Sequence, residues 1–172
     1  KVKNSINDIL WDEQKGYYVN YVDGDFIEDN LSVDTVLVYL FGISNEVRSN
    51  RMLDAMENLL ETKNNQLQEA GDYGVMCVYP FYKGVYSSYG KSSQDYEYHN
   101  GGNWPYWSAI YAYAKFLAGR EWRYALESWF VYNLERGIFT PVEYFSPCRK
   151  SGSTLQAWSG AAAFTLDFID KD

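Results

Sequence analysis

The chain has 172 residues, enough for one domain with a hydrophobic core, and 47% of them are apolar, as in ordinary globular proteins. Its net charge of −8, with scattered lysines and arginines, argues against nucleic-acid binding, and no apolar run is long enough to span a bilayer. Aromatic residues make up 19% of the chain, which suits either stacking on sugar rings or an ordinary tyrosine-rich core.

The first third of the chain predicts helices joined by loops, without strong strand alternation. Residues 2–10 are expected to be the end of a helix. Residues 23–30 are expected to form a solvated turn, because their carboxylates lack the spacing of an EF-hand; calcium binding is the alternative. Residues 31–41 are predicted to be a nearly all-apolar helix closed by Gly42. Ser44 is predicted to cap the next helix. Its apolar face carries Val47, Met52, Leu53, Met56, Leu59 and Leu60.

The middle of the chain contains a long segment without helical period, residues 71–102. It exceeds the usual connection length and is rich in aromatic residues, so we expect an ordered, functional loop. Residues 103–117 are predicted to form a helix with Pro105 in its first turn. This helix is apolar almost all round and is expected to be covered from several sides. Further helices are predicted over residues 122–135 and from Thr154 onward.

Two segments place polar and aromatic residues in a loop that leads directly into a buried helix, residues 96–114 and residues 140–164. Loops of this kind form pockets at one end of a helical scaffold. Glu143 lies among aromatic neighbours, where a carboxylate can exchange protons near neutral pH. The alternative is an ordinary surface glutamate. His99, the only histidine, is either a ligand-binding residue or a group that hydrogen-bonds its own loop.

The chain has only two cysteines, Cys77 and Cys148, and they lack the spacing of a metal site or a disulfide framework. We expect two free thiols in a reducing compartment, and therefore a cytoplasmic protein, with one disulfide as the alternative. The first residue is Lys1 rather than Met, so we expect a processed product or a fragment.

Several motifs resemble the six-hairpin, (α/α)6-toroid glycosidases, a group with glucoamylases, processing α-glucosidases, trehalases, neutral invertases and debranching-type amylo-1,6-glucosidases. YHNGGNWP (residues 98–105) is similar to their YHNG-x-WP signature. VEYFSP (residues 142–147) with SGSTLQAWSGAAA (residues 151–163) resembles their glutamate loop and the helix after it. YGVMCVYPFY (residues 73–82) and LWDEQKGYYVNYVDGD (residues 10–25) resemble two further recurring segments.

This resemblance implies an all-α fold in which antiparallel helical hairpins form part of an (α/α)6 toroid, with long aromatic loops at one end. Residues 1–172 would be a single domain, the C-terminal half of a glycosidase catalytic domain. The implied activity is inverting hydrolysis of an α-linked glucoside, without cofactor or metal, and Glu143 would be the catalytic base. The residues implied to bind the substrate are Tyr98, His99, Asn100, Trp104, Gln156 and Trp158.

The chain departs from this family pattern in length. A full toroid has about twelve helices, and the general acid of these enzymes lies upstream of the part that this chain resembles. Asp72 is the only alternative acid that we identify. We therefore expect an oligosaccharide or glucoside substrate, and a partner that is the N-terminal half of the toroid or a second copy of the chain. The alternatives are a non-catalytic carbohydrate-binding domain, a structural helical domain, and an isomerase or epimerase, which would need a second histidine.

Overall fold

The computed structural model describes residues 1–82, 94–140, 142–148, 152–153, 155–160, 165 and 169. The helices, in chain order, are α1 (Val2–Ile9), the 3₁₀ helix η1 (Val33–Val36), α2 (Leu37–Leu40), α3 (Glu46–Leu59), α4 (Pro105–Leu117), α5 (Arg123–Glu135) and the 3₁₀ helix η2 (Ala157–Gly160). The strands are β1 (Trp11–Asp12), β2 (Tyr17–Tyr18), β3 (Tyr21–Asp23), β4 (Phe26–Glu28), β5 (Leu31–Ser32) and β6 (Val78–Tyr79). No described helix has the length and apolar composition needed to cross a membrane.

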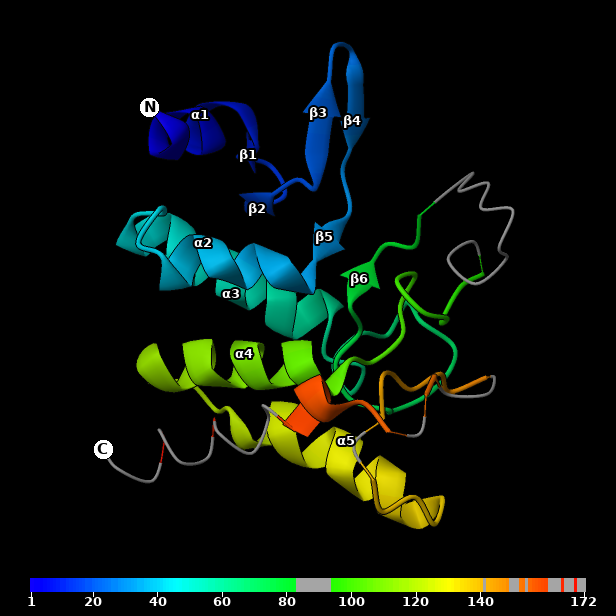
Figure 1. The fold of residues 1–172 in the computed structure, drawn as a ribbon. Coiled ribbons are helices and arrows are strands. Elements are labelled where there is room, and N and C mark those ends of the chain that lie inside the picture. Colours follow the sequence, from blue (N-terminus) through cyan, green and yellow to red (C-terminus); the bar gives the residue numbers. More distant parts are fainter. Residues whose placement is uncertain are drawn as a thin grey trace.

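The expected all-α class, with helical hairpins of an (α/α)6 toroid, is wrong, because three two-stranded antiparallel sheets lie among the helices. β1 and β2 are joined by a turn in which Asp12 Oδ1 accepts hydrogen bonds from the backbone N–H groups of Gln14 and Lys15, at 2.8 and 2.9 Å. β3 and β4 form a hairpin that turns at Gly24, with φ of +58°, and stands away from the helices (Figure 1). Strands of two or three residues are too short for their alternation to be recognised in the sequence.

The predicted helix over residues 31–41 is also corrected, since the segment begins as a strand. β5 pairs with β6, with Leu31 opposite Tyr79. The backbone N–H of Val33 then donates to the carbonyl oxygen of Cys77, at 2.8 Å. These bonds hold the start of the segment in extended form, so only η1 and the short α2 remain helical.

The other long helices are confirmed within a residue or two. α3 is capped by Asn45 rather than by Ser44, because Asn45 Oδ1 accepts a hydrogen bond from the Arg48 N–H at 2.9 Å. Of its predicted apolar face, Val47 is 68% exposed, whereas four side chains are fully buried: Met52, Leu53, Met56 and Leu60. Of the last predicted helix, η2 is described, and residues 161–164 lie outside the described residues.

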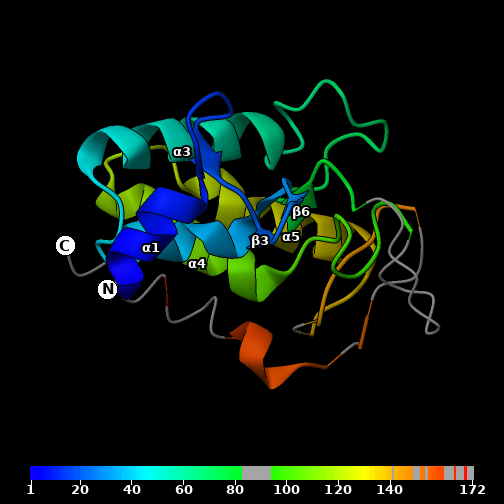
Figure 2. The ribbon, with the colours of Figure 1, turned by 90° about the horizontal axis from the view of Figure 1, so that it is seen from above.

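α4 is the central helix of the fold. It packs against α5, η1 and η2, which confirms that it is covered from several sides. Seen from above, η2 lies on the side of α4 away from α3 (Figure 2). The N-terminal end of α4 therefore lies among the segments that carry the predicted site residues.

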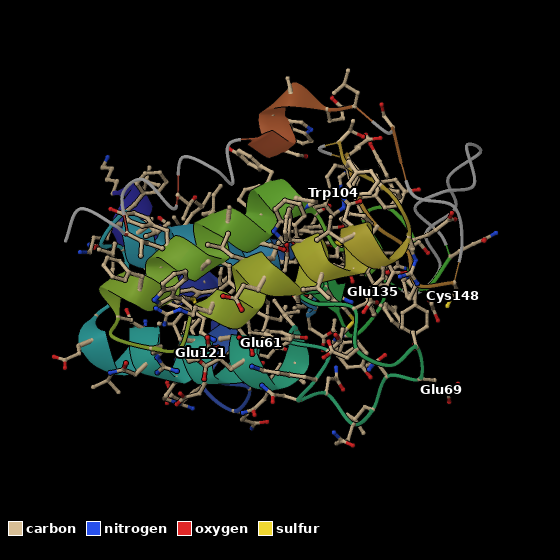
Figure 3. All side chains as sticks on the ribbon, turned by 90° about the horizontal axis from the view of Figure 1, so that it is seen from below. Glu61, Glu69, Trp104, Glu121, Glu135 and Cys148 are labelled. Atoms are coloured by element: carbon tan, nitrogen blue, oxygen red, sulfur yellow. The ribbon has the colours of Figure 1, made fainter. Side chains whose placement is uncertain are left out.

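A buried ionic network ties α4 to the end of α3. Lys115 and Glu61 are each 1% exposed, and the Lys115 ammonium group contacts the Glu61 carboxylate and lies 3.3 Å from Glu57 Oε1. The Tyr111 hydroxyl donates a further hydrogen bond to Glu61 Oε1, at 3.2 Å. Figure 3 shows Glu61 toward α3, away from Trp104 at the start of α4. Because charges in such surroundings are costly to leave unpaired, the network fixes how α3 and α4 meet.

We predict that Lys115→Met lowers the free energy of unfolding by about 3–5 kcal/mol, because it removes the buried ammonium group from Glu61 and leaves that buried carboxylate with only the partly exposed Lys63 as a cation. Urea unfolding at neutral pH measures this loss. The matched control is Lys15→Met, which removes a surface pair with Asp29 and is expected to cost less than about 1 kcal/mol. Equal destabilisation by the two variants would contradict the assigned role of the network.

Candidate functional site

Two short backbone hydrogen bonds join the segments that carry the predicted site. The N–H of Asn103 donates to the carbonyl of Phe145 at 2.9 Å, and the N–H of Phe145 donates to the carbonyl of Asn103 at 2.7 Å. The fully buried Asn103 side chain donates to the Tyr73 carbonyl at 3.0 Å and accepts from Ser108 Oγ at 3.1 Å. Asn103 therefore holds the long loop, the start of α4 and the Glu143 loop together.

Glu143 is half-buried and is held by the segment that follows it. Its N–H donates to the Ser153 carbonyl at 2.9 Å, and its Oε2 accepts from the Ser153 N–H at 3.1 Å. Gly152 is required here, because a Cβ atom at that position would lie 2.6 Å from Glu143 Oε2 and 2.5 Å from the Tyr144 ring. The Glu143 carboxylate is thus held in place by the backbone hydrogen bond of this residue and by its own hydrogen bond to Ser153.

An aromatic stack lies beside this carboxylate, with Trp104 at its centre. His99 lies flat on Trp104, with ring centroids 4.6 Å apart and an interplanar angle of 1°. Tyr144 also stacks on Trp104, at 5.5 Å and 25°. The Trp104 indole N–H donates to the Tyr98 carbonyl at 2.9 Å, and the Tyr98 ring meets Trp104 edge-on at 5.0 Å. The structure therefore brings three predicted site residues, Tyr98, His99 and Trp104, into one cluster with Tyr144.

η2 adds Trp158 to this cluster. Trp158 is 43% exposed, stacks on Tyr106 at 5.0 Å and meets Trp104 edge-on at 5.7 Å. Gln156 is half-buried and directly precedes η2, where its carbonyl accepts from the Ser159 N–H at 3.1 Å. Trp158 thus offers the most exposed indole of the group.

His99 connects the aromatic stack with the carboxylates. Partial burial lowers the pKa of His99 below its usual range, and the negative charges of Glu143 and Asp34 partly offset this decrease. The imidazole is therefore neutral at pH 7, with one N–H donor and one acceptor nitrogen. A group of this kind can hydrogen-bond a hydroxyl in either direction.

Asn100 has a different environment from the other predicted site residues. Its side chain is fully buried, its Oδ1 accepts from the Tyr82 N–H at 2.7 Å, and its Nδ2 donates to Asp95 Oδ1 at 3.4 Å. These bonds shape the loop on both sides of residues 83–93, which lie outside the described residues. A direct contact between Asn100 and a ligand would require breaking them.

Asp72, the alternative acid, lies elsewhere. Its Oδ1 accepts from the hydroxyls of Tyr124 and Thr62, at 2.5 and 3.0 Å. It lines a cavity of about 650 Å³ between the long loop and α5, and neither Glu143 nor His99 lines that cavity. The structure therefore does not bring Asp72 together with Glu143.

The described residues contain no cluster of three or more His, Cys, Asp or Glu side chains that could hold a metal ion. The acidic segment of residues 23–30 is largely the exposed β3–β4 hairpin, in line with the expected solvated turn. Cys77 is buried and Cys148 is exposed, and both are free thiols, as expected. Burial raises the pKa of Cys77 to about 12, so this thiol is unreactive at neutral pH.

Sequence reasoning missed Asn103, Tyr106 and Asp34. Asn103 lies inside YHNGGNWP, but its side-chain partners are Tyr73 and Ser108, one of them distant in sequence. The charge of Asp34 acts on His99, and the pairing of β5 with β6 is what brings their two segments together. The sequence alone could show only that residues at the start of one helix, such as Trp104 and Tyr106, lie close together.

A sequence model described as amylo-alpha-1,6-glucosidase matches residues 1–165, a range that contains every residue of the cluster. No curated protein matched the chain. The resemblance inferred from the motifs around His99 and Glu143 is therefore confirmed for the family.

The only histidine of the chain gives a direct test of the site geometry by proton NMR. We predict that His99 titrates below about 6.5, the usual pKa of histidine. Glu143→Gln should lower this pKa further, because it removes a negative charge that favours the imidazolium form.

The control for this titration is Glu135→Gln, a change at the exposed end of α5, which should leave the His99 curve unchanged. A His99 pKa that does not respond to Glu143→Gln would show that the two groups are not neighbours, and a pKa above 6.5 would contradict the predicted effect of burial.

Proposed function

This chain belongs to the amylo-alpha-1,6-glucosidase family, and we propose that it takes part in inverting hydrolysis of an α-linked glucoside with Glu143 as the general base. Membership of the family relates the chain to glycoside hydrolases and makes a carbohydrate the expected substrate. Mechanism, residue roles and linkage go beyond that relationship and are our proposal.

The observation that carries this proposal is the position of Glu143. Its carboxylate is held by the Ser153 N–H, next to Gly152, and its charge acts on the His99 imidazole that lies on Trp104. Aromatic rings with a few fixed polar groups are typical of sugar sites, because a sugar ring has apolar faces and a polar edge.

In the proposed reaction, Glu143 takes a proton from a water molecule, which attacks the anomeric carbon as the glycosidic bond breaks. Inversion requires a second carboxyl group to protonate the leaving oxygen, about 6.5–9.5 Å from the base. The family motifs in this chain mark only Glu143. We propose that an upstream segment or a second copy of the chain supplies the acid.

The proposed substrate contacts depend on which side chains of the site are accessible to a ligand. Trp104 is 2% exposed and is covered by His99 and Tyr144, so it supports the site rather than stacking on the sugar. Trp158 is the exposed ring on which a sugar can stack. His99 offers one donor and one acceptor to sugar hydroxyls. Tyr98 and Gln156, both half-buried, would complete the polar contacts.

A partner is also part of the proposal. Apolar side chains are exposed along α5 and in the segment after it: Phe130, Val131, Leu134 and Phe139. Covering such side chains favours association, although the ordering that association requires offsets part of the gain. A homo-oligomer or a chain segment with the second carboxyl would cover them. The free thiols Cys77 and Cys148 support a reducing, cytoplasmic location.

We predict that Glu143→Gln lowers kcat for isomaltose, an α-1,6-linked disaccharide, by a factor of about 10²–10⁴ with little change in KM, because the water then lacks its base. The protein is assayed with its partner, and glucose release and the anomer formed are followed by NMR. Glu143→Ala with azide should recover turnover as a glucosyl azide, since azide needs no deprotonation.

The matched control is Glu46→Gln, at an exposed glutamate at the start of α3, which should leave kcat unchanged. If Glu143→Gln also leaves kcat unchanged, Glu143 is not the base. If isomaltose binds but neither the wild type nor any partnered form hydrolyses it, the alternative of a non-catalytic carbohydrate-binding domain is correct.

A further inference from the structure

Asp34, in η1, is brought to the site by pairing between distant segments. β5 pairs with β6, and directly before Asp34 the N–H of Val33 donates to the Cys77 carbonyl at 2.8 Å. The N–H of Cys77 in turn donates to the carbonyl of Gly102 at 2.9 Å. Gly102 belongs to the loop that carries His99, and η1 itself packs against α4. Asp34 therefore lies beside the same end of α4 as the aromatic stack.

The Asp34 side chain is exposed and makes few interactions with the described part of the protein. Among the described residues, its only hydrogen bond comes from the Ser32 hydroxyl, to Oδ1, and no lysine or arginine forms an ion pair with it. Within that part of the chain, Oδ2 has no hydrogen-bond partner. Asp12, by comparison, uses its carboxylate to close a turn.

The charge of Asp34 acts on the site. It raises the pKa of His99, as Glu143 does more strongly, and it also contributes to the raised pKa values of Cys77 and Tyr82. Such interactions fall off within about 8–10 Å in a salt solution. Asp34 and Glu143, from different elements of the fold, therefore both lie within electrostatic range of one imidazole.

We propose that Asp34 is a second carboxylate of the sugar pocket and that its Oδ2 accepts a hydrogen bond from a hydroxyl group of the bound sugar. The assignment rests on the proposed carbohydrate function. A carboxylate with a free oxygen is an acceptor only, which suits a hydroxyl donor. Asp34 and Glu143 would contact different parts of one sugar, so that Asp34 helps to select the sugar while Glu143 acts on the water.

The test measures binding of isomaltose by calorimetry to the protein and to three variants. Asp34→Asn and Asp34→Ala are expected to weaken binding about 10- to 100-fold, the usual loss for a hydrogen bond to a charged group. The matched control is Asp25→Asn, an exposed aspartate in the β3–β4 turn, which should bind as the wild type does. Both variants at position 34 should fold, because the side chain is exposed.

Monodeoxy analogues of isomaltose identify the hydroxyl group. The wild-type protein should bind one analogue about 10-fold or more weakly than isomaltose, and Asp34→Ala should bind that analogue and isomaltose equally well. The NMR titration of His99 serves as the check on position, since Asp34→Asn should lower its pKa and Asp25→Asn should not.

The outcomes separate the two proposals. If Asp34→Ala binds isomaltose as tightly as the wild type, while Glu143→Gln abolishes hydrolysis, the role of Asp34 is overturned and the proposed function stands. Weaker binding to Asp34→Ala without any change in the preference among deoxy analogues would also overturn the direct contact. If the wild-type protein binds none of these sugars, both proposals fail.

Discussion

The site depends on one interaction, the pair of backbone hydrogen bonds between Asn103 and Phe145. Trp104 directly follows one partner, and the segment with Glu143 directly precedes the other. Because the Asn103 side chain also bonds Tyr73 and Ser108, the same residue fixes the long loop against α4. A fully buried amide with both of its polar atoms bonded is costly to move, so the segments that meet there hold one relative position.

Close backbone approach and aromatic packing then give the site its shape. A Cβ atom at Gly102 would lie 2.7 Å from the Tyr98 carbonyl, so only glycine allows the loop to pass there. The aromatic rings fill the space around Trp104 and leave Trp158 partly exposed. Beside this apolar centre lie His99 and the Glu143 carboxylate, which supply hydrogen-bond donors and acceptors. An apolar surface with a polar edge matches the chemistry of a sugar ring.

The sequence predicted the parts of this arrangement that depend on local pattern. α3, α4 and α5 are long enough for their period to be visible, and the motifs around His99 and Glu143 indicated the family. Strands of two or three residues are too short to show a period. The sequence therefore did not predict the sheets or the strand with which residues 31–41 begin. The position of Asp34 and the burial of Asn100 depend on bonds between distant segments. Composition and spacing carry no information about such bonds, so only the folded structure could place these residues.

The central claim is that His99, Trp104 and Trp158 belong to one sugar-binding site. It is tested most directly by adding isomaltose to the protein and following the single imidazole and the six indole signals by NMR. The account predicts that the signals of His99, Trp104 and Trp158 shift together along one saturating curve, while those of Trp11 and Trp122 stay unchanged. Shifts confined to tryptophans outside the cluster, or separate curves for Trp104 and Trp158, would contradict it.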